Sequence, residues 1–91
     1  MSCRLLLPTV LRDSAGGSRE VEAQGSTVRE VLDDLAGRLP MLERRLRDES
    51  GQLRPHVLIF VDGVNVRGST ELDTGVRDGA EIFVAPAVSG G

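Results

Sequence analysis

The 91-residue sequence lacks lysine, tryptophan and tyrosine, and it contains one cysteine and two phenylalanines. A single cysteine, Cys3, excludes an internal disulfide, a cysteine-based zinc site and a four-cysteine iron–sulfur cluster. Because all eleven basic residues are arginine, the chain cannot form isopeptide polymers through lysine side chains of its own. With Phe60 and Phe83 as the only aromatic residues, the core must be built from leucine, valine, isoleucine and alanine.

Long hydrophobic runs and an excess of positive charge are also missing. No apolar segment approaches the length of a membrane span and the N-terminus lacks the apolar core of a signal peptide, so we expect a cytoplasmic protein without a membrane partner. The net charge of −3 argues against nucleic acid as a partner and suits a protein partner with a basic surface. No nucleophile–base pair and no set of metal ligands stands out, so we expect neither a metal site nor autonomous enzymatic activity.

The first quarter of the chain is predicted to form a strand, a turn and a second strand. Residues 3–10 include three consecutive leucines, a pattern typical of a strand buried on both faces, with Cys3 as an ordinary strand residue. Small and polar residues at 13–18 indicate a turn. Polar and apolar residues then alternate over 19–23, as in a half-buried strand.

The clearest predicted element is a helix that begins near Thr27 and ends before Pro40. Thr27 and Glu30 have the spacing of a capping box. Apolar residues then recur on one helical face, which we expect to cover a sheet: Val28, Val31, Leu32, Leu35, Ala36 and Leu39. Residues 41–46 can add a short helical turn, and the arginines at 44, 45 and 47, interleaved with acidic residues, indicate a solvated face.

Three further strands are predicted in the second half. Residues 47–55 form a polar loop, and His56, which has no catalytic partner nearby in the sequence, is interpreted as structural. The apolar run 57–61 indicates a central strand, and the Asp-Gly pair that follows indicates a tight turn into a short strand at 64–66. Residues 69–77 are read as irregular, and 80–85 as the last strand.

This order of elements predicts an α+β roll in which one main helix packs on a mixed sheet of about five strands. The helix connects two strands and must cross one face of the sheet. The opposite face has no cover of its own and is the natural surface for a partner.

The sequence ends on two glycines, Gly90 and Gly91, after a proline at position 86. Such a tail either has no function or is a working terminus whose carboxylate is the reactive group. Two residues without a Cβ would let the backbone enter a narrow cleft in another protein. We favour the working terminus, with a domain at residues 1–85 and a tail at residues 86–91.

The whole chain resembles the ThiS and MoaD type of ubiquitin-like sulfur carriers, which have a β-grasp fold. The resemblance is carried by the sequences FVDGVNV and DGAEIFVAPAVSGG, and the tail most resembles the actinobacterial carriers of cysteine biosynthesis. It implies that the carboxylate of Gly91 becomes a thiocarboxylate, and that Gly90 before it is needed because it has no side chain. The arm that enters the partners' active sites would then be Pro86, Ala87, Val88 and Ser89.

The resemblance also implies the partners and the alternatives. An ATP-dependent, E1-like adenylating enzyme would activate Gly91, so that ATP is used by that enzyme and no cofactor is bound by the carrier. The sulfur acceptor would be a cysteine-synthase-like enzyme or the large subunit of molybdopterin synthase, and a metalloprotease that trims or releases the tail is a further candidate partner. The alternatives are a molybdopterin synthase small subunit and a ubiquitin-like modifier conjugated through Gly91.

Overall fold

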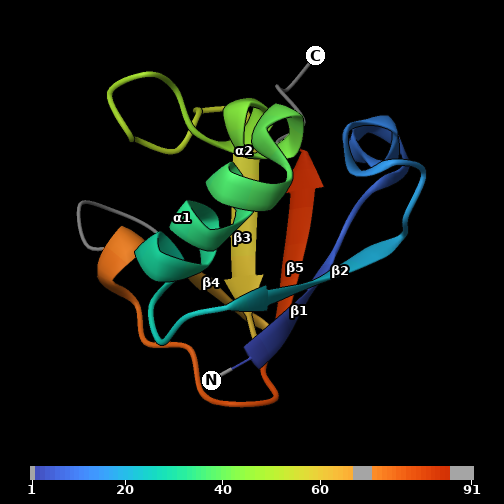
Figure 1. Ribbon diagram of the computed structural model, residues 1–91. Helices are drawn as coiled ribbons and strands as arrows, with labels where there is room; N and C mark the ends of the chain where they lie inside the picture. Colours follow the sequence, from blue (N-terminus) through green and yellow to red (C-terminus); the bar gives the residue numbers. More distant parts are fainter. Residues whose placement is uncertain (1, 67–70, 87–91) are drawn as a thin grey trace.

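The computed structural model describes residues 2–66 and 71–86, and a five-stranded mixed sheet forms its centre (Figure 1). The strand order is β2-β1-β5-β3-β4, with β1 and β5 parallel and the other neighbouring pairs antiparallel. The first and last strands are therefore neighbours at the middle of the sheet. The strands are β1 (Ser2–Leu6), β2 (Glu20–Gln24), β3 (Val57–Val61), β4 (Val64–Val66) and β5 (Glu81–Pro86).

Helix α1 (Val28–Arg38) begins at the predicted cap. The Glu30 backbone N–H donates to the Thr27 hydroxyl oxygen at 3.1 Å, and the Glu30 carboxylate accepts from the Ser26 backbone N–H at 2.8 Å. These bonds satisfy two N–H groups at the start of the helix that have no intrahelical partner. The predicted apolar face packs on the sheet, with Val28, Val31, Leu32 and Leu35 buried.

The short helical turn predicted at residues 41–46 is present as a second α-helix, which follows the main helix directly. Helix α2 (Pro40–Leu46) carries two fully buried leucines, Leu42 and Leu46. Pro40 ends α1 and also opens α2, since proline is well tolerated in the first turn of a helix, where its missing N–H has no partner to lose. Figure 1 shows both helices on the same face of the sheet.

The connection between β1 and β2 also differs from the prediction. The first strand stops at Leu6, and residues Thr9–Ala15 form the 3-10 helix η1, whose Leu11 and Ala15 are buried. The strand itself alternates, with Cys3 and Leu5 buried and Arg4 exposed, so it is covered on one face and not on two. A second 3-10 helix, η2 (Glu71–Asp73), lies within the segment predicted to be irregular.

Arg47 is buried, which corrects the prediction of a solvated arginine face for this position. Its side chain is 9% exposed and lies 2.8 Å from the Glu43 carboxylate and 2.9 Å from that of Asp33. The guanidinium thus joins the end of α2 to α1. Arg44 and Arg45 are exposed, as predicted.

The core fills the space between the sheet and the helices. It is built from aliphatic residues and Cys3, with no aromatic member, in agreement with the composition. In the described residues no helix is long and apolar enough to cross a membrane.

Candidate functional site: the root of the C-terminal arm

The predicted site is the C-terminal arm, and the structure describes its root. Pro86, predicted as the first residue of the tail, is the last residue of β5 and pairs with Val57 of β3. Ala87, Val88, Ser89, Gly90 and Gly91 lie outside the described residues. The described chain therefore ends next to β3, and the surfaces around Pro86 lie within reach of the predicted reactive end.

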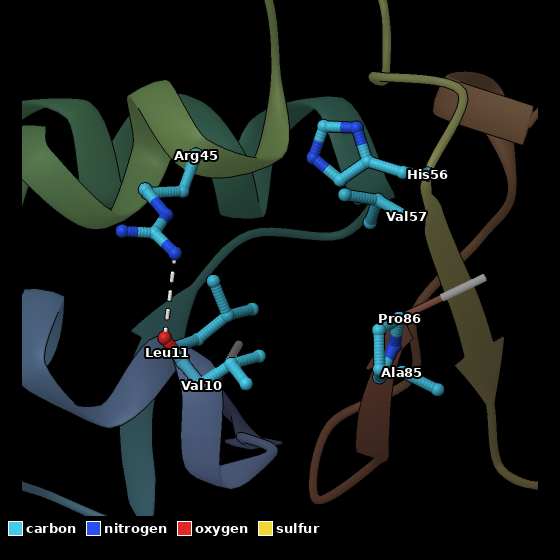
Figure 2. A pocket seen from close by; sticks show the side chains of 7 residues that line it. All are labelled: Val10, Leu11, Arg45, His56, Val57, Ala85 and Pro86. Carbon is cyan, nitrogen blue, oxygen red and sulfur yellow. Dashed lines mark hydrogen bonds between the residues drawn. The ribbon is translucent and has the colours of Figure 1, made fainter. Parts of the chain in front are cut away.

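A small pocket opens beside this root (Figure 2). Its cavity volume is about 70 Å³, enough for part of one apolar side chain. Its walls come from η1, from α2, and from the facing ends of β3 and β5. The lining residues are Val10, Leu11, Arg45, His56, Val57, Ala85 and Pro86.

Two basic side chains border this otherwise apolar pocket. The Arg45 guanidinium donates to the Val10 carbonyl at 3.4 Å, a long hydrogen bond. His56 lies in the turn before β3, and Figure 2 shows its ring directed toward the side of the pocket where Arg45 lies. Nothing in the sequence indicated this arrangement, because Val10, Arg45 and Pro86 are far apart along the chain.

The face of the sheet opposite the helices carries an apolar patch. Phe60 and Phe83 face each other on β3 and β5, with ring centroids 6.3 Å apart in an edge-to-face arrangement. Phe83 is 47% exposed, a large fraction for an aromatic side chain. Two positions further along the same two strands, Leu58 and Ala85 form another pair on this face. The predicted helix-free surface is thus present, and its centre is apolar.

Charged residues flank this patch on β1, β2 and β5. The Arg4 guanidinium lies 2.7 Å from the Glu81 carboxylate and 3.7 Å from that of Glu20. All three side chains are about half exposed. Glu22, also exposed on β2, has no ion pair among the residues described, so the edge carries more negative than positive charge.

Two residues with reactive groups are placed in structural roles. Cys3 is buried, and this burial, together with the nearby carboxylates of Asp34 and Glu22, raises the pKa of its thiol, so it is not poised as a nucleophile. Asp62 closes the β3–β4 turn, where its carboxylate accepts from Arg77 Nε at 3.0 Å and from the Glu81 backbone N–H at 3.1 Å. Across residues 2–66 and 71–86, no cluster of three or more histidine, cysteine or acidic side chains could hold a metal ion.

The family model for the ThiS family matches residues 5–91. The chain belongs to this family. It is 38% identical to the sulfur carrier protein CysO of Mycobacterium tuberculosis H37Rv, in an alignment that spans all of both chains.

Solved structures agree with this assignment. The structure matches a chain of the Amycolatopsis orientalis BexX/CysO complex with a TM-score of 0.86 and 37% identity, over 98% of this chain and 99% of that one. It matches SAMP1 of Haloferax volcanii with a TM-score of 0.81 and 32% identity, over the whole of both chains. The expected β-grasp fold is therefore confirmed.

Proposed function

We propose that this protein is a sulfur carrier whose Gly91 carboxylate is converted to a thiocarboxylate that supplies sulfur in the biosynthesis of cysteine or a related metabolite. The observation that carries the proposal is the full-length similarity to a sulfur carrier protein, CysO. The position of Pro86 at the end of β5 supports it, because a central strand of the sheet leads directly into the residues that precede Gly90 and Gly91.

The chemistry requires a partner enzyme, because a free carboxylate is a poor electrophile. An ATP-dependent adenylating enzyme would let the Gly91 carboxylate attack the α-phosphorus of ATP, with pyrophosphate as the leaving group. A sulfur donor would then attack the acyl carbon and displace AMP. The thiocarboxylate formed in this way is ionised at neutral pH and is a strong nucleophile. The carrier is a co-substrate in these two reactions, and the partner enzyme is their catalyst.

The partners follow from this role. We expect the adenylating enzyme to bury the apolar patch around Phe60 and Phe83 and to place basic residues against the acidic edge of that face. A sulfur-accepting biosynthetic enzyme would bind the same arm, and a metalloprotease that trims or releases the tail is a further expected partner. A cytoplasmic location would give the carrier access to ATP and to these enzymes.

A protein modifier is the second candidate, since SAMP1 of Haloferax volcanii is the small archaeal modifier protein 1. Activation would be the same, and the attacking group would be a lysine of a target protein. Mass spectrometry of cell lysates separates the two functions, because a modifier yields conjugates on many proteins and a carrier yields the free thioacid. The molybdopterin synthase alternative stays a prediction that the neighbouring genes would test.

The decisive experiment incubates the purified chain with its adenylating enzyme, ATP and a sulfide source. One terminal oxygen should be exchanged for sulfur. Because oxidation of Met1, Met41 or Cys3 gives nearly the same change in mass, the product must also be alkylated by a thiol-directed reagent, with fragmentation placing the adduct on Gly91. Wild-type protein that remains unmodified at Gly91 would overturn the proposal.

Two tail variants sharpen this experiment. Adding one residue after Gly91 should abolish the reaction, since the added residue occupies the reactive end. Gly90→Val should still bind the enzyme but react about a hundredfold more slowly, because a branched side chain displaces the carboxylate from its reactive position. An extended chain that accepts sulfur without first being trimmed would contradict the working terminus.

A further inference from the structure

The pocket beside Pro86 lies within reach of any enzyme that holds Gly91. Five residues follow Pro86, and even a fully extended chain of that length spans only about 17 Å. The mouth of the enzyme's cleft must therefore come within this distance of Pro86. Because Pro86 itself lines the pocket, the rim of the cleft can reach the pocket.

The apolar wall of the pocket is open to a partner. Val10 is 61% exposed although it is an aliphatic residue, and it faces the strand ends that carry Ala85 and Pro86. An exposed apolar side chain at the edge of an apolar pocket gives a partner a surface to bury.

The charge at the rim specifies the partner's chemistry. No carboxylate pairs with Arg45 within the described parts of the chain, and its one hydrogen bond, to the Val10 carbonyl, is long. Other arginines do have carboxylate partners, for instance Arg38 with Asp34 at 2.7 Å and Arg77 with Asp62 at 3.0 Å. An arginine whose donors are mostly free, next to a histidine, suits an anionic group, which on a protein partner is a carboxylate.

We propose that this pocket is a second docking site for the adenylating enzyme, which inserts an apolar side chain between Val10 and Pro86 and pairs a neighbouring carboxylate with Arg45. The proposal rests on the sulfur-carrier function. The charge here is opposite to that of the helix-free face, where the carrier presents acidic residues. Two flanking surfaces of opposite sign fix the rotation of the carrier about its arm, which a single short arm would leave free.

The test compares two charge reversals on the same helix. Arg45→Glu should raise the KM for the carrier in adenylation by about tenfold, because a carboxylate would then face a carboxylate, while kcat at saturation stays within about twofold. Arg44→Glu is the matched control: it is exposed, changes the net charge equally, and should leave KM within about twofold of wild type. Arg45→Met, which removes the charge without reversing it, should give an intermediate KM. Equal KM values for the variants at 44 and 45 would overturn the proposal.

A second pair of variants tests the apolar wall of the pocket. Val10→Ser should raise KM by about fivefold through lost burial, whereas Val64→Ser, similarly exposed at the far hairpin, should change it by less than twofold. Thermal melts that match the wild type would show that each variant is folded. Addition of the enzyme should shift the methyl resonances of Val10 and not those of Val64, and the reverse result would contradict docking at the pocket.

Two further outcomes separate this proposal from its alternatives. If the pocket instead held the chain's own arm, Val88→Ser would shift the Val10 methyl signals in the free protein, and that result would overturn docking of the enzyme. If the wild-type chain forms the thiocarboxylate but KM is insensitive to position 45, the second docking site is wrong and the carrier function stands. A wild-type chain that accepts no sulfur overturns the carrier function and this proposal with it.

Discussion

The two faces of the sheet differ in how completely their apolar side chains are covered, and β5 contributes to both. Ile82 and Val84 point toward the helices and are fully buried, whereas Phe83 between them is about half exposed on the other face. Alternate residues of one strand therefore have different roles. Substitutions on the helix-covered face should change stability, and substitutions on the helix-free face should change binding to a partner.

The largest effect is expected when one apolar residue from each face is replaced by alanine and the losses of stability are compared. Leu32→Ala should lower the free energy of unfolding by about 2–5 kcal/mol, because it opens a cavity under α1. Phe83→Ala should lower it by less than about 1 kcal/mol but weaken association with the adenylating enzyme. Chemical denaturation measures the first quantity and titration calorimetry the second. Equal losses of stability would show that the helix-free face belongs to the core.

Charged residues offer a second comparison of the two faces. Arg47→Met should cost about 1–3 kcal/mol of unfolding free energy, because it leaves the nearly buried Glu43 carboxylate without its partner. Arg4→Met on the helix-free face should cost no more than about 1 kcal/mol, since the ion pairs with Glu20 and Glu81 are exposed to solvent. Urea denaturation of both variants provides the measurement, and a larger loss for Arg4→Met would reverse the assignment.

Acid should weaken the hydrogen bonds of Asp34, whose carboxylate links α1 to β2. The side-chain hydrogen bond from Arg38 lowers the pKa of the Asp34 carboxyl, and the Gln24 backbone N–H adds to the effect. A carboxyl whose pKa is lower in the folded state contributes stability above its ordinary pKa and loses it as the pH falls toward the folded value. Asp34→Asn should therefore lower stability at neutral pH and reduce its decline in acid.

The control for this pH experiment comes from the other face. Glu22→Gln removes an exposed carboxylate that has no ion pair among the described residues. In thermal melts between neutral and acidic pH, the melting temperature of this variant should fall with pH as steeply as that of the wild type. A decline for Asp34→Asn as steep as that of the wild type would mean that the Asp34 hydrogen bonds do not govern acid stability.

The smallest expected effect concerns the rate of association. If the acidic edge of the helix-free face meets basic residues of the adenylating enzyme, Glu22→Gln should lower the association rate constant by about twofold at low salt. Raising the salt concentration should slow the wild type and remove this difference, because exposed charges are then screened. Stopped-flow fluorescence can measure both, and a rate that is independent of salt would show that electrostatic attraction does not guide docking.

Local signals in the sequence predicted much of the fold. The Thr27–Glu30 pair fixed the start of α1, and the Asp62-Gly63 turn has the positive φ angles that its residues favour, 49° and 85°. The central position of β5 beside β1 joins residues almost eighty positions apart, so no local signal predicts it; it belongs to the β-grasp fold that the resemblance implies.

Long-range packing explains what sequence reasoning missed. Arg47 has the same local pattern as Arg44 and Arg45, and it is buried because the end of α2 lies against α1, next to Asp33. Helix α2 is too short to show a clear helical repeat of apolar residues. The sequence around it therefore did not predict that it packs against η1 and α1. The arm was predicted from its glycines, whereas the pocket at its root joins four separate segments and could be found only in the folded chain.

The parallel pairing of β1 with β5 has a consequence for biosynthesis. Until β5 is available, the sheet is divided into two separate hairpins, β1–β2 and β3–β4, which have no strand between them. During translation β5 leaves the ribosome after the other four strands, so the sheet can close only once residues 81–86 have been made. Polypeptides terminated before position 81 would lack the central strand and expose the core to proteolysis. A closed sheet therefore marks chains that have been translated at least to Pro86, the root of the arm.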